Sequence, residues 1–182
     1  MTNTNWLAHT NICIDGFADT INNITQNLEP TDVSDKSTRG YKSLQFSMKN
    51  NFKDIENITS EITKQFQSIE PLQNKKFELL LGWTVYGRQG GYHTVHNHVG
   101  EYGKLDHVSV VIYLETPDLT GWQQKGQFYY FLLDNNEIKY HEIQPEKGMM
   151  IVMPTKTLHG TYPQPRGLRH TLNLDFGVKH DN

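Results

Sequence analysis

The sequence predicts a mainly β fold, a double-stranded β-helix (jelly roll) with two N-terminal helices packed on the outside of one sheet. The first 75 residues carry two amphipathic helical patterns, whereas the rest of the 182-residue chain carries several short strand patterns separated by turn residues. Many short strands at such spacing are typical of sandwiches and barrels. We therefore expect a helical part at residues 1–75 and a jelly-roll core at residues 76–182, within one single domain.

Two stretches of the N-terminal part repeat apolar residues at helical spacing. The first stretch, residues 17–28, stops before Pro30, and the second, residues 55–69, stops before Pro71. Spacings of three and four residues place the apolar side chains on one helix face, and a proline ends a helix at the preceding residue. The polar residues 31–43 between the two stretches predict a loop.

The residues after 75 change to strand patterns. Residues 77–85 alternate apolar and other side chains, whereas residues 108–114 and 149–153 are almost continuous apolar runs. Such continuous runs predict strands that are covered on both faces. Three further strands are expected, at residues 127–133, 138–143 and 168–178.

The last predicted strand has two unlike faces. One face is apolar, and the other carries Arg169, Thr171, Asn173 and Asp175. A wholly polar face is either exposed to solvent, with Arg169 in a surface ion pair, or lines a polar cavity. In a cavity, the arginine fork would match a carboxylate and the threonine hydroxyl would add a donor. The strand alone leaves both alternatives open.

Three of the nine histidines fall within residues 93–98, in the stretch His-Thr-Val-His-Asn-His. His96 and His98 are two residues apart, so on a strand their side chains share a face and could share a metal ion. His93 would face the other way on a regular strand. His159 follows a distant strand and a proline turn, and we expect it to add the third ligand. The alternative is a solvated, histidine-rich turn.

These residues form a pattern that resembles the Fe(II)/2-oxoglutarate-dependent oxygenase superfamily, and in particular its small, prolyl-hydroxylase-like members from bacteria and their viruses. The resemblance covers roughly residues 77–177 and says little about the first 70. The residues that carry it are Gly82-Trp83, Gly91–His93, His96–His98, Ser109–Leu114, Pro145–Gly148, Pro154, His159-Gly160 and Arg169–Asn173.

The resemblance implies a non-haem Fe(II)- and 2-oxoglutarate-dependent dioxygenase, a hydroxylase that consumes dioxygen. It implies that His96 and His159 bind Fe(II). It also implies that Arg169 and Thr171 anchor a carboxylate of 2-oxoglutarate, with Tyr113 and Asn173 among the residues around that cosubstrate.

The sequence departs from the family pattern at His98, where the superfamily usually has aspartate or glutamate. Two histidines and one carboxylate are the usual ligands of this class of iron site. We expect His98 to be the third ligand, with Glu101 and Asp106 as alternative sources of a carboxylate. On this interpretation His98→Asp restores the usual ligand and keeps the iron.

Several residues near the histidine motif are candidates for the rim of the substrate site, because loops on a rigid scaffold carry specificity. They are Tyr92, His93, Tyr102, His107 and Trp122. Trp83, by contrast, is expected to lie in the core.

Two alternative functions follow from the same residues. Cupins share the jelly roll and the H-x-H motif, and the spacing from Gly148 through Pro154 to His159 fits their second motif. One alternative is therefore a cupin-like metalloenzyme or metal-binding jelly roll that does not use 2-oxoglutarate. A binding or structural jelly roll without catalysis is the other. The pair Arg169 and Thr171, ten residues beyond His159, belongs to the oxygenase pattern and favours the oxygenase.

Composition limits the partners. The formal net charge of -3 argues against nucleic acid, and no apolar stretch approaches the roughly 20 residues of a membrane span. One cysteine, Cys13, excludes an intrachain disulfide, and we expect it to be buried. With no signal peptide visible, a cytoplasmic location is expected. The substrate is expected to be a small molecule or a peptide.

Overall fold

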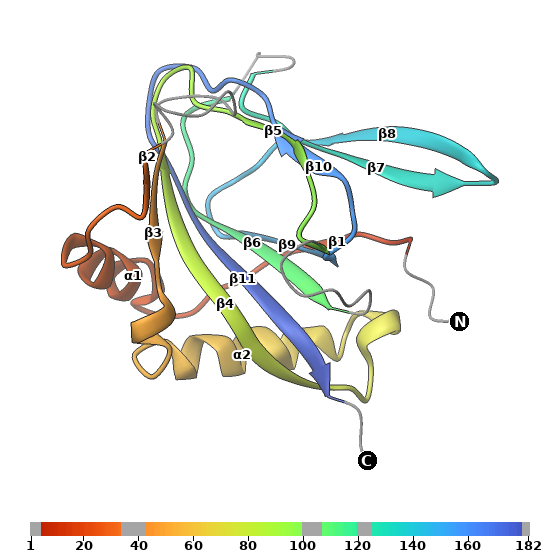
Figure 1. The fold of residues 1–182 in the computed structure, drawn as a ribbon, viewed down its shortest axis with the longest axis horizontal. Coiled ribbons are helices and arrows are strands. Elements are labelled where there is room, and N and C mark those ends of the chain that lie inside the picture. Colours follow the sequence, from red (N-terminus) through yellow and green to blue (C-terminus); the bar gives the residue numbers. More distant parts are fainter. Residues whose placement is uncertain (1–4, 34–42, 100–106, 120–124, 180–182) are drawn as a thin grey trace.

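Two antiparallel β-sheets form the centre of this mainly β protein, as the computed structural model shows for residues 5–33, 43–99, 107–119 and 125–179 (Figure 1). The large sheet has seven strands in the order β1-β9-β6-β11-β4-β3-β2, and the small sheet has four in the order β5-β10-β7-β8. Strands far apart in the sequence are therefore hydrogen-bonded neighbours, as in a jelly roll.

The elements have the following bounds. The strands of the large sheet are β1 (Ala8–Asn11), β2 (Asp32–Val33), β3 (Ser43–Ser47), β4 (Lys76–Gly87), β6 (Val108–Glu115), β9 (Met149–Pro154) and β11 (Arg169–Lys179). Those of the small sheet are β5 (His93–His96), β7 (Phe128–Asp134), β8 (Glu137–Ile143) and β10 (His159–Thr161). The α-helices of the described residues are α1 (Phe17–Gln26) and α2 (Glu56–Phe66), and two 3-10 turns are η2 (Lys49–Asn51) and η3 (Glu70–Leu72).

The six strands predicted from the sequence are all present, with ends that shift by one or two residues. The continuous apolar runs behave as predicted, since β9 is buried throughout and β6 is buried except for its last residue. Both strands lie inside the large sheet, where other elements cover their two faces.

The prediction of a loop over residues 31–43 is wrong at both ends. Asp32 and Val33 form β2, Ser43 begins β3, and these two strands pair with each other. Residues 34–42 lie outside the described residues. The strand here depends on pairing with β4 through β3, which a local sequence pattern does not reveal.

The expectation that Cys13 is buried is also wrong, because its side chain is exposed. Cys13 lies in the connection between β1 and α1, next to the buried Ile12. Connecting segments run over the protein surface, which accounts for the difference.

Two apolar clusters lie on opposite faces of the large sheet. The first joins α1 and α2 to residues of β6, β9 and β11, with Phe66 of α2 packed edge-to-face on Phe176 at a centroid distance of 5.3 Å. The second lies between the two sheets and contains Tyr113, Phe128 and Ile151. Each fully buried side chain of this size contributes about 1.5–3 kcal/mol of transfer free energy, so the two clusters hold the large sheet in a fixed position.

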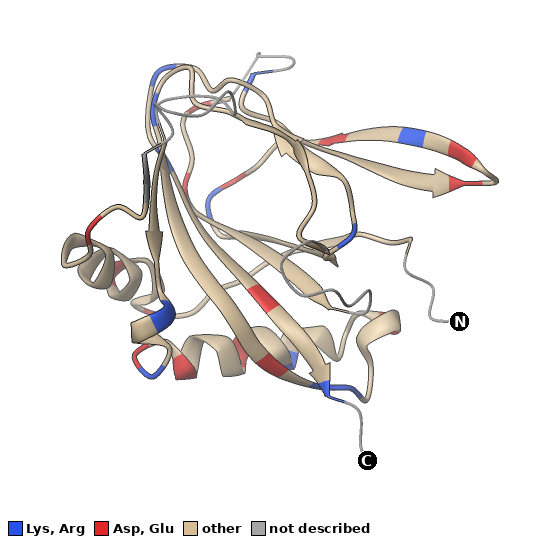
Figure 2. Cartoon of the chain, viewed as in Figure 1, with Lys and Arg blue, Asp and Glu red and all other residues tan. Residues whose placement is uncertain are grey.

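Charged side chains are spread over the described part of the chain. Figure 2 shows Lys and Arg on several elements and loops, mixed with Asp and Glu, rather than gathered on one face. This pattern is unlike the basic stripe of a nucleic-acid-binding protein. Among the helices of the described ranges, none has the length and apolar character needed to cross a membrane.

Candidate functional site

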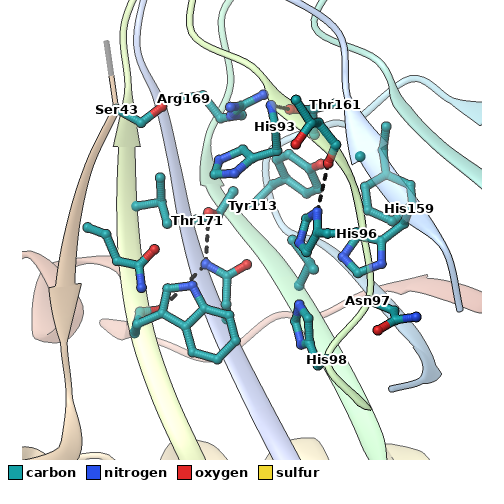
Figure 3. Close-up of a pocket in the computed structure, with 18 of the residues that line it drawn as sticks. Ser43, His93, His96, Asn97, His98, Tyr113, His159, Thr161, Arg169 and Thr171 are labelled. Atoms are coloured by element: carbon teal, nitrogen blue, oxygen red, sulfur yellow. Dashed lines mark hydrogen bonds between the residues drawn. The ribbon is translucent and has the colours of Figure 1, made fainter. Parts of the chain in front are cut away.

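A pocket with a cavity volume of about 600 Å³ lies between the two sheets, lined by residues of β3, β4, β5, β6, β7, β10 and β11 (Figure 3). It brings together all seven residues that the sequence proposed for the metal and the cosubstrate. In the view of Figure 3, His96, His98 and His159 lie toward the right, and Arg169 lies at the top, above His93. The seven are His96, His98, Tyr113, His159, Arg169, Thr171 and Asn173.

Three histidines form a group that could hold one metal ion. One ring nitrogen from each of His96, His98 and His159 lies within 4.8 Å of the others. His96 and His159 are directly opposite each other in the register of β5 and β10. His98 follows β5, and its backbone N–H donates to the carbonyl oxygen of Thr155 at 2.8 Å, which fixes the turn that carries it. Paired strands and one anchored turn therefore hold the group together.

Each of the three rings is oriented by a hydrogen bond at Nδ1. His96 Nδ1 lies 2.8 Å from the carbonyl oxygen of Thr94, and His159 Nδ1 lies 2.9 Å from that of Thr157. A carbonyl only accepts, so both rings carry their proton on Nδ1 and leave the Nε2 lone pair for a metal. His98 makes the equivalent contact to a side chain, Asp175. Metal-bound histidines in proteins are commonly held in this way.

The hydrogen bond at Nδ1 of His98 has a carboxylate as its acceptor, whereas those of His96 and His159 have backbone carbonyl groups. His98 Nδ1 lies 3.0 Å and 3.1 Å from the two carboxylate oxygens of Asp175, and 3.0 Å from Oγ of Ser109. The Ser109 hydroxyl donates to Asp175 at 2.6 Å. The indole of Trp83 packs on the His98 ring at a centroid distance of 5.4 Å. His98 is thus fixed by a charged acceptor and an aromatic ring.

His93 faces the pocket, contrary to the expectation from a regular strand. Between the pairs His159–His96 and Thr161–His93 the register shifts, because three residues of β5 span two of β10. Such a bulge changes the alternation of side chains, so His93 and His96 can turn toward the same side. His93 is not part of the group of three histidines.

Burial keeps two histidines of this pocket, His159 and His93, neutral. Desolvation, and then the nearby His96 and His98, hold the pKa of His159 well below its usual value. Desolvation, followed by the charge of Arg169, lowers the pKa of His93 to about 3. Neutral imidazole is the form that binds metals, so the site needs no proton release at His159 before an ion enters.

The opposite side of the pocket presents buried donors. Arg169 is only 2% exposed, and neither its Nη1 nor its Nη2 has a hydrogen-bond partner among the described residues. The hydroxyl of Tyr113 is buried and likewise has no partner there, and burial raises its pKa to about 12, so it stays a donor. Buried polar groups without partners are rare, and a cation with two of them fits an anionic ligand.

Thr171 and Asn173 complete that side. The Asn173 amide donates to Oγ1 of Thr171 at 3.1 Å and approaches the carbonyl oxygen of Trp83 at 3.5 Å. Because Thr171 accepts from Asn173, its own hydroxyl proton remains available to donate to a ligand in the pocket. Arg169, Thr171 and Asn173 of this face therefore line a cavity, Asp175 is fully buried, and the alternative of a solvated face is wrong.

Other residues near the motif lie differently from expectation. Trp83 lines the pocket rather than the core. Tyr92 and His107 are absent from the pocket lining that the described ranges form. Glu101, Asp106, Tyr102 and Trp122 lie outside the described residues. The sequence also missed the wall formed by β3, whose contribution is Ser43, Gln45 and Ser47.

No protein-family model matches the chain, and no curated protein matches its sequence. Solved structures do share its fold. One is a 2OG-Fe(II) oxygenase family oxidoreductase from Burkholderia pseudomallei, with a TM-score of 0.70, 11% identity, and coverage of 94% of this chain and 84% of that one.

Two further structures with this fold contain ligands. A prolyl hydroxylase from Trichoplax adhaerens, in complex with a hypoxia inducible factor peptide fragment, has a TM-score of 0.69 and 15% identity over 96% of this chain and 84% of that one. HygX from Streptomyces hygroscopicus, with nickel, 2-oxoglutarate and hygromycin B bound, has a TM-score of 0.68 and 11% identity over 96% and 84%. The chain therefore has the fold of 2-oxoglutarate-dependent oxygenases.

Proposed function

We propose that this protein is a non-haem Fe(II)- and 2-oxoglutarate-dependent dioxygenase that hydroxylates its substrate. One observation carries the proposal: a group of three histidines and the buried, unpartnered guanidinium of Arg169 line the same pocket. A metal site alone would not require such a cation, and an anion site alone would not require the histidines. The fold shared with 2-oxoglutarate-dependent oxygenases supports the same conclusion.

The donor set fits the metal. His96, His98 and His159 would hold Fe(II) through Nε2, since a hydrogen-bond acceptor lies at Nδ1 of each ring. Three protein ligands leave further coordination positions for other ligands, as in other catalytic metal sites. The position that the superfamily usually gives to a carboxylate is taken by His98.

The opposite side of the pocket fits 2-oxoglutarate. Arg169 would bind its distal carboxylate through a two-pronged contact, and the hydroxyls of Tyr113 and Thr171 would donate to the same group. Asn173 would orient Thr171 through the hydrogen bond between them. The ligand would thereby satisfy the buried donors of Arg169 and Tyr113 that have no partner among the described residues.

When bound, iron with 2-oxoglutarate and dioxygen would supply the oxidising chemistry. The chain's own residues would orient the reactants and exclude water. Phe128 stacks on His159 at a centroid distance of 5.5 Å, and Trp83 covers His98, so aromatic rings shield two of the three ligands. His93, neutral at pH 7, adds a polar group without adding a charge.

The main alternative is a cupin-like metalloenzyme or a metal-binding jelly roll that does not use 2-oxoglutarate. Such a protein would also need the three histidines. It would leave the buried Arg169 without a function, and for this reason we favour the oxygenase.

We also propose the broader setting of the site. The substrate would be a small molecule or a peptide, since structures with this fold bind a peptide fragment in one case and hygromycin B in another. Residues 1–75 and 76–182 would form one domain, with α1 and α2 on the outside of the large sheet. The apolar cluster that both helices share with β6 and β11 supports this arrangement. The single cysteine agrees with a cytoplasmic location.

An anaerobic titration tests the proposed function. Fe(II) and then 2-oxoglutarate are added to the protein under nitrogen, and we expect a visible charge-transfer absorption band that requires both. Admission of dioxygen should then yield succinate, even without the substrate. His96→Ala should abolish the band because iron is lost. Iron binding in the unaltered protein with neither band nor succinate would favour the cupin-like alternative.

A further inference from the structure

We propose that Asp175 is the carboxylate of this metal centre, and that it acts through His98 instead of binding the ion itself. The inference rests on the proposed metal site. Iron sites of this class usually combine two histidines with one carboxylate that binds the ion directly. Here the group of three contains only histidines, and the described residues that line the pocket include no aspartate or glutamate.

The contact between the two side chains is close and fully enclosed. Asp175 is 0% exposed, and its two carboxylate oxygens lie 3.0 Å and 3.1 Å from Nδ1 of His98. A carboxylate accepts hydrogen bonds, so His98 carries its proton on Nδ1 and presents Nε2 to the ion. The negative charge of Asp175 therefore lies one imidazole ring away from the metal position.

Ser109 and the strand register hold Asp175 in this orientation. Asp175 of β11 and Ser109 of β6 are paired directly across the two strands, and the Ser109 hydroxyl donates to Oδ1 of Asp175 at 2.6 Å. Ser109 Oγ also lies 3.0 Å from Nδ1 of His98. Three side chains from separate parts of the chain thus form one buried polar cluster.

The polar face of β11 carries two charged side chains, Arg169, which lines the pocket, and Asp175, which contacts His98. Arg169 begins the strand, and Asp175 lies six residues further along the same face. Because alternate residues of a strand point to one side, the anchor for the anionic cosubstrate and the carboxylate behind the metal are fixed relative to each other. One rigid element would thereby set the distance between the two halves of the site.

A carboxylate in this position would affect metal binding in two ways. It fixes the ring and makes Nε2 a better donor, which is the usual effect of a carboxylate hydrogen-bonded to a metal-bound histidine. It also offsets part of the ion's charge in a buried site, where electrostatic interactions are stronger than in water. Asp175 is a positioning residue in this scheme, since it touches His98 and not the ion.

A titration with Co²⁺ alone, without 2-oxoglutarate, tests the inference. Asp175→Asn keeps the shape of the side chain and removes its charge. We expect this variant to bind Co²⁺ about 10–100-fold more weakly than the unaltered protein, as found for other partners of metal-bound histidines. In a His98→Ala background the same change should alter the affinity less than about twofold, because Asp175 acts through His98.

Thr84→Val is the matched control for loss of a buried polar contact. Thr84 is 0% exposed, and its hydroxyl lies 3.3 Å from Oγ1 of Thr25, on the helix side of the same sheet. It is absent from the described pocket lining, so its loss should leave Co²⁺ affinity unchanged. A melting curve of each metal-free variant separates loss of fold from loss of metal binding.

The outcomes are distinct. If Asp175→Asn binds Co²⁺ with an affinity within about twofold of the unaltered protein, the inference is overturned and the proposed function still stands. The same holds if Asp175→Asn lowers the Co²⁺ affinity equally in the His98→Ala background. Failure of the unaltered protein to bind Co²⁺ would instead refute the metal site itself. If Asp175→Asn does not fold, the ring ¹⁵N resonances of His98 in the unaltered protein decide. A proton on Nδ1 supports the inference, and a proton on Nε2 overturns it.

Discussion

His159 lies directly opposite His96 across β10 and β5, and the centroids of the two rings are 4.4 Å apart. Because both side chains stand on hydrogen-bonded strands, the backbone of the small sheet fixes the two residues opposite each other. We predict that His96→Ala and His159→Ala each abolish stoichiometric Fe(II) binding while the fold survives. Metal analysis and circular dichroism measure the two effects.

His93→Ala is the control for this experiment, since His93 lies on the same strand and in the same pocket but outside the group of three. It should keep full iron occupancy. Full occupancy in either of the other two variants would remove that histidine from the ligand set.

Removal of the Arg169 guanidinium should separate cosubstrate binding from metal binding. We predict that Arg169→Ala keeps Fe(II) and weakens 2-oxoglutarate binding by about 2–5 kcal/mol, the usual loss when one partner of a buried charged pair is truncated. Arg169→Lys should recover part of the loss, because the charge returns without the fork. Calorimetric titration with 2-oxoglutarate measures both. Wild-type affinity in Arg169→Ala would leave the cupin-like alternative as the better interpretation.

The glycine opposite Arg169 provides a second test of the same wall. Gly87 pairs with Arg169 across β4 and β11, and a Cβ atom there would lie 3.2 Å from Nη2 of Arg169 and 2.7 Å from Oε1 of Gln164. The Gln164 amide is held by the carbonyl oxygens of Gly87 and Gly167. Gly87→Ala should therefore displace Arg169 and weaken 2-oxoglutarate binding. We expect the free energy of binding to become less favourable by about 1–3 kcal/mol, the usual cost of adding an atom to a well-packed region.

Iron affinity should not change in Gly87→Ala, since the three histidines proposed as metal ligands lie outside β4 and β11. Gly177→Ala is the comparison, because the atoms nearest to a Cβ there belong to the flexible side chain of Leu80. Equal 2-oxoglutarate affinities in the two variants would contradict the prediction.

The Asp175 contact changes what is expected of His98→Asp. From the sequence alone this substitution restores a usual ligand and keeps the iron. In the structure it would remove the Nδ1–H donor from a buried carboxylate and bring a second carboxylate close to it. We predict that His98→Asp lowers the free energy of unfolding of the metal-free protein by about 3–5 kcal/mol, the cost of breaking a buried pair.

The double variant His98→Asp with Asp175→Asn should regain most of that stability, because only one buried carboxylate remains. Urea denaturation of the metal-free proteins measures both changes. If the single variant is as stable as the unaltered protein, the two side chains are not coupled in the way that the distances indicate.

The stability of the protein should depend on the protonation of His170. This ring is 1% exposed and stacks on Tyr86 at a centroid distance of 4.0 Å, and burial lowers its pKa to about 4 from 6.5. The folded state therefore favours neutral His170. The stability that comes from burying the neutral ring is fully present above pH 6.5. As the pH falls from 6.5 toward 4, the free energy of unfolding decreases by at most about 3 kcal/mol, because the unfolded state takes up the proton first.

His170→Phe should remove this dependence, because phenylalanine keeps a ring against Tyr86 and has no charge at any pH. The difference in unfolding free energy between the two proteins, measured at pH 7.5 and pH 4.5, should shift in favour of His170→Phe at the lower pH. Parallel curves would show that His170 is not responsible.

The parts of the fold that the sequence predicted are those with a strong local pattern. The apolar runs that became β6 and β9 could be recognised because both faces are buried, and the turns between strands carry glycine and proline. β1, β2, β3, β5 and β10 were missed because they are short and partly polar, and their pairing partners are distant in the sequence.

The site shows the same division. The alternation of β11 and the spacing of His96 and His98 indicated which side chains share a face. The structure brings His96, His98, Arg169, Thr171 and Asn173 into one pocket, and it places Asp175 against His98. The orientation of His93 depends on a bulge that no spacing rule reveals. The contact of Asp175 with His98 joins residues 77 positions apart. The sequence around each of the two residues contains no signal that they meet.

The hydrogen bonds at Nδ1 of the three histidines have a consequence for the metal that the protein acquires in a cell. A site of three pre-oriented imidazoles binds divalent ions with an affinity that rises from Fe²⁺ through Co²⁺ and Ni²⁺ to Cu²⁺. Zn²⁺ also binds such a site more tightly than Fe²⁺ does. Ferrous iron is thus the weakest competitor among these ions. Occupancy by iron would depend on the free concentrations of copper, zinc and nickel around the newly folded chain, and mismetallation would inactivate the protein without any change in its sequence.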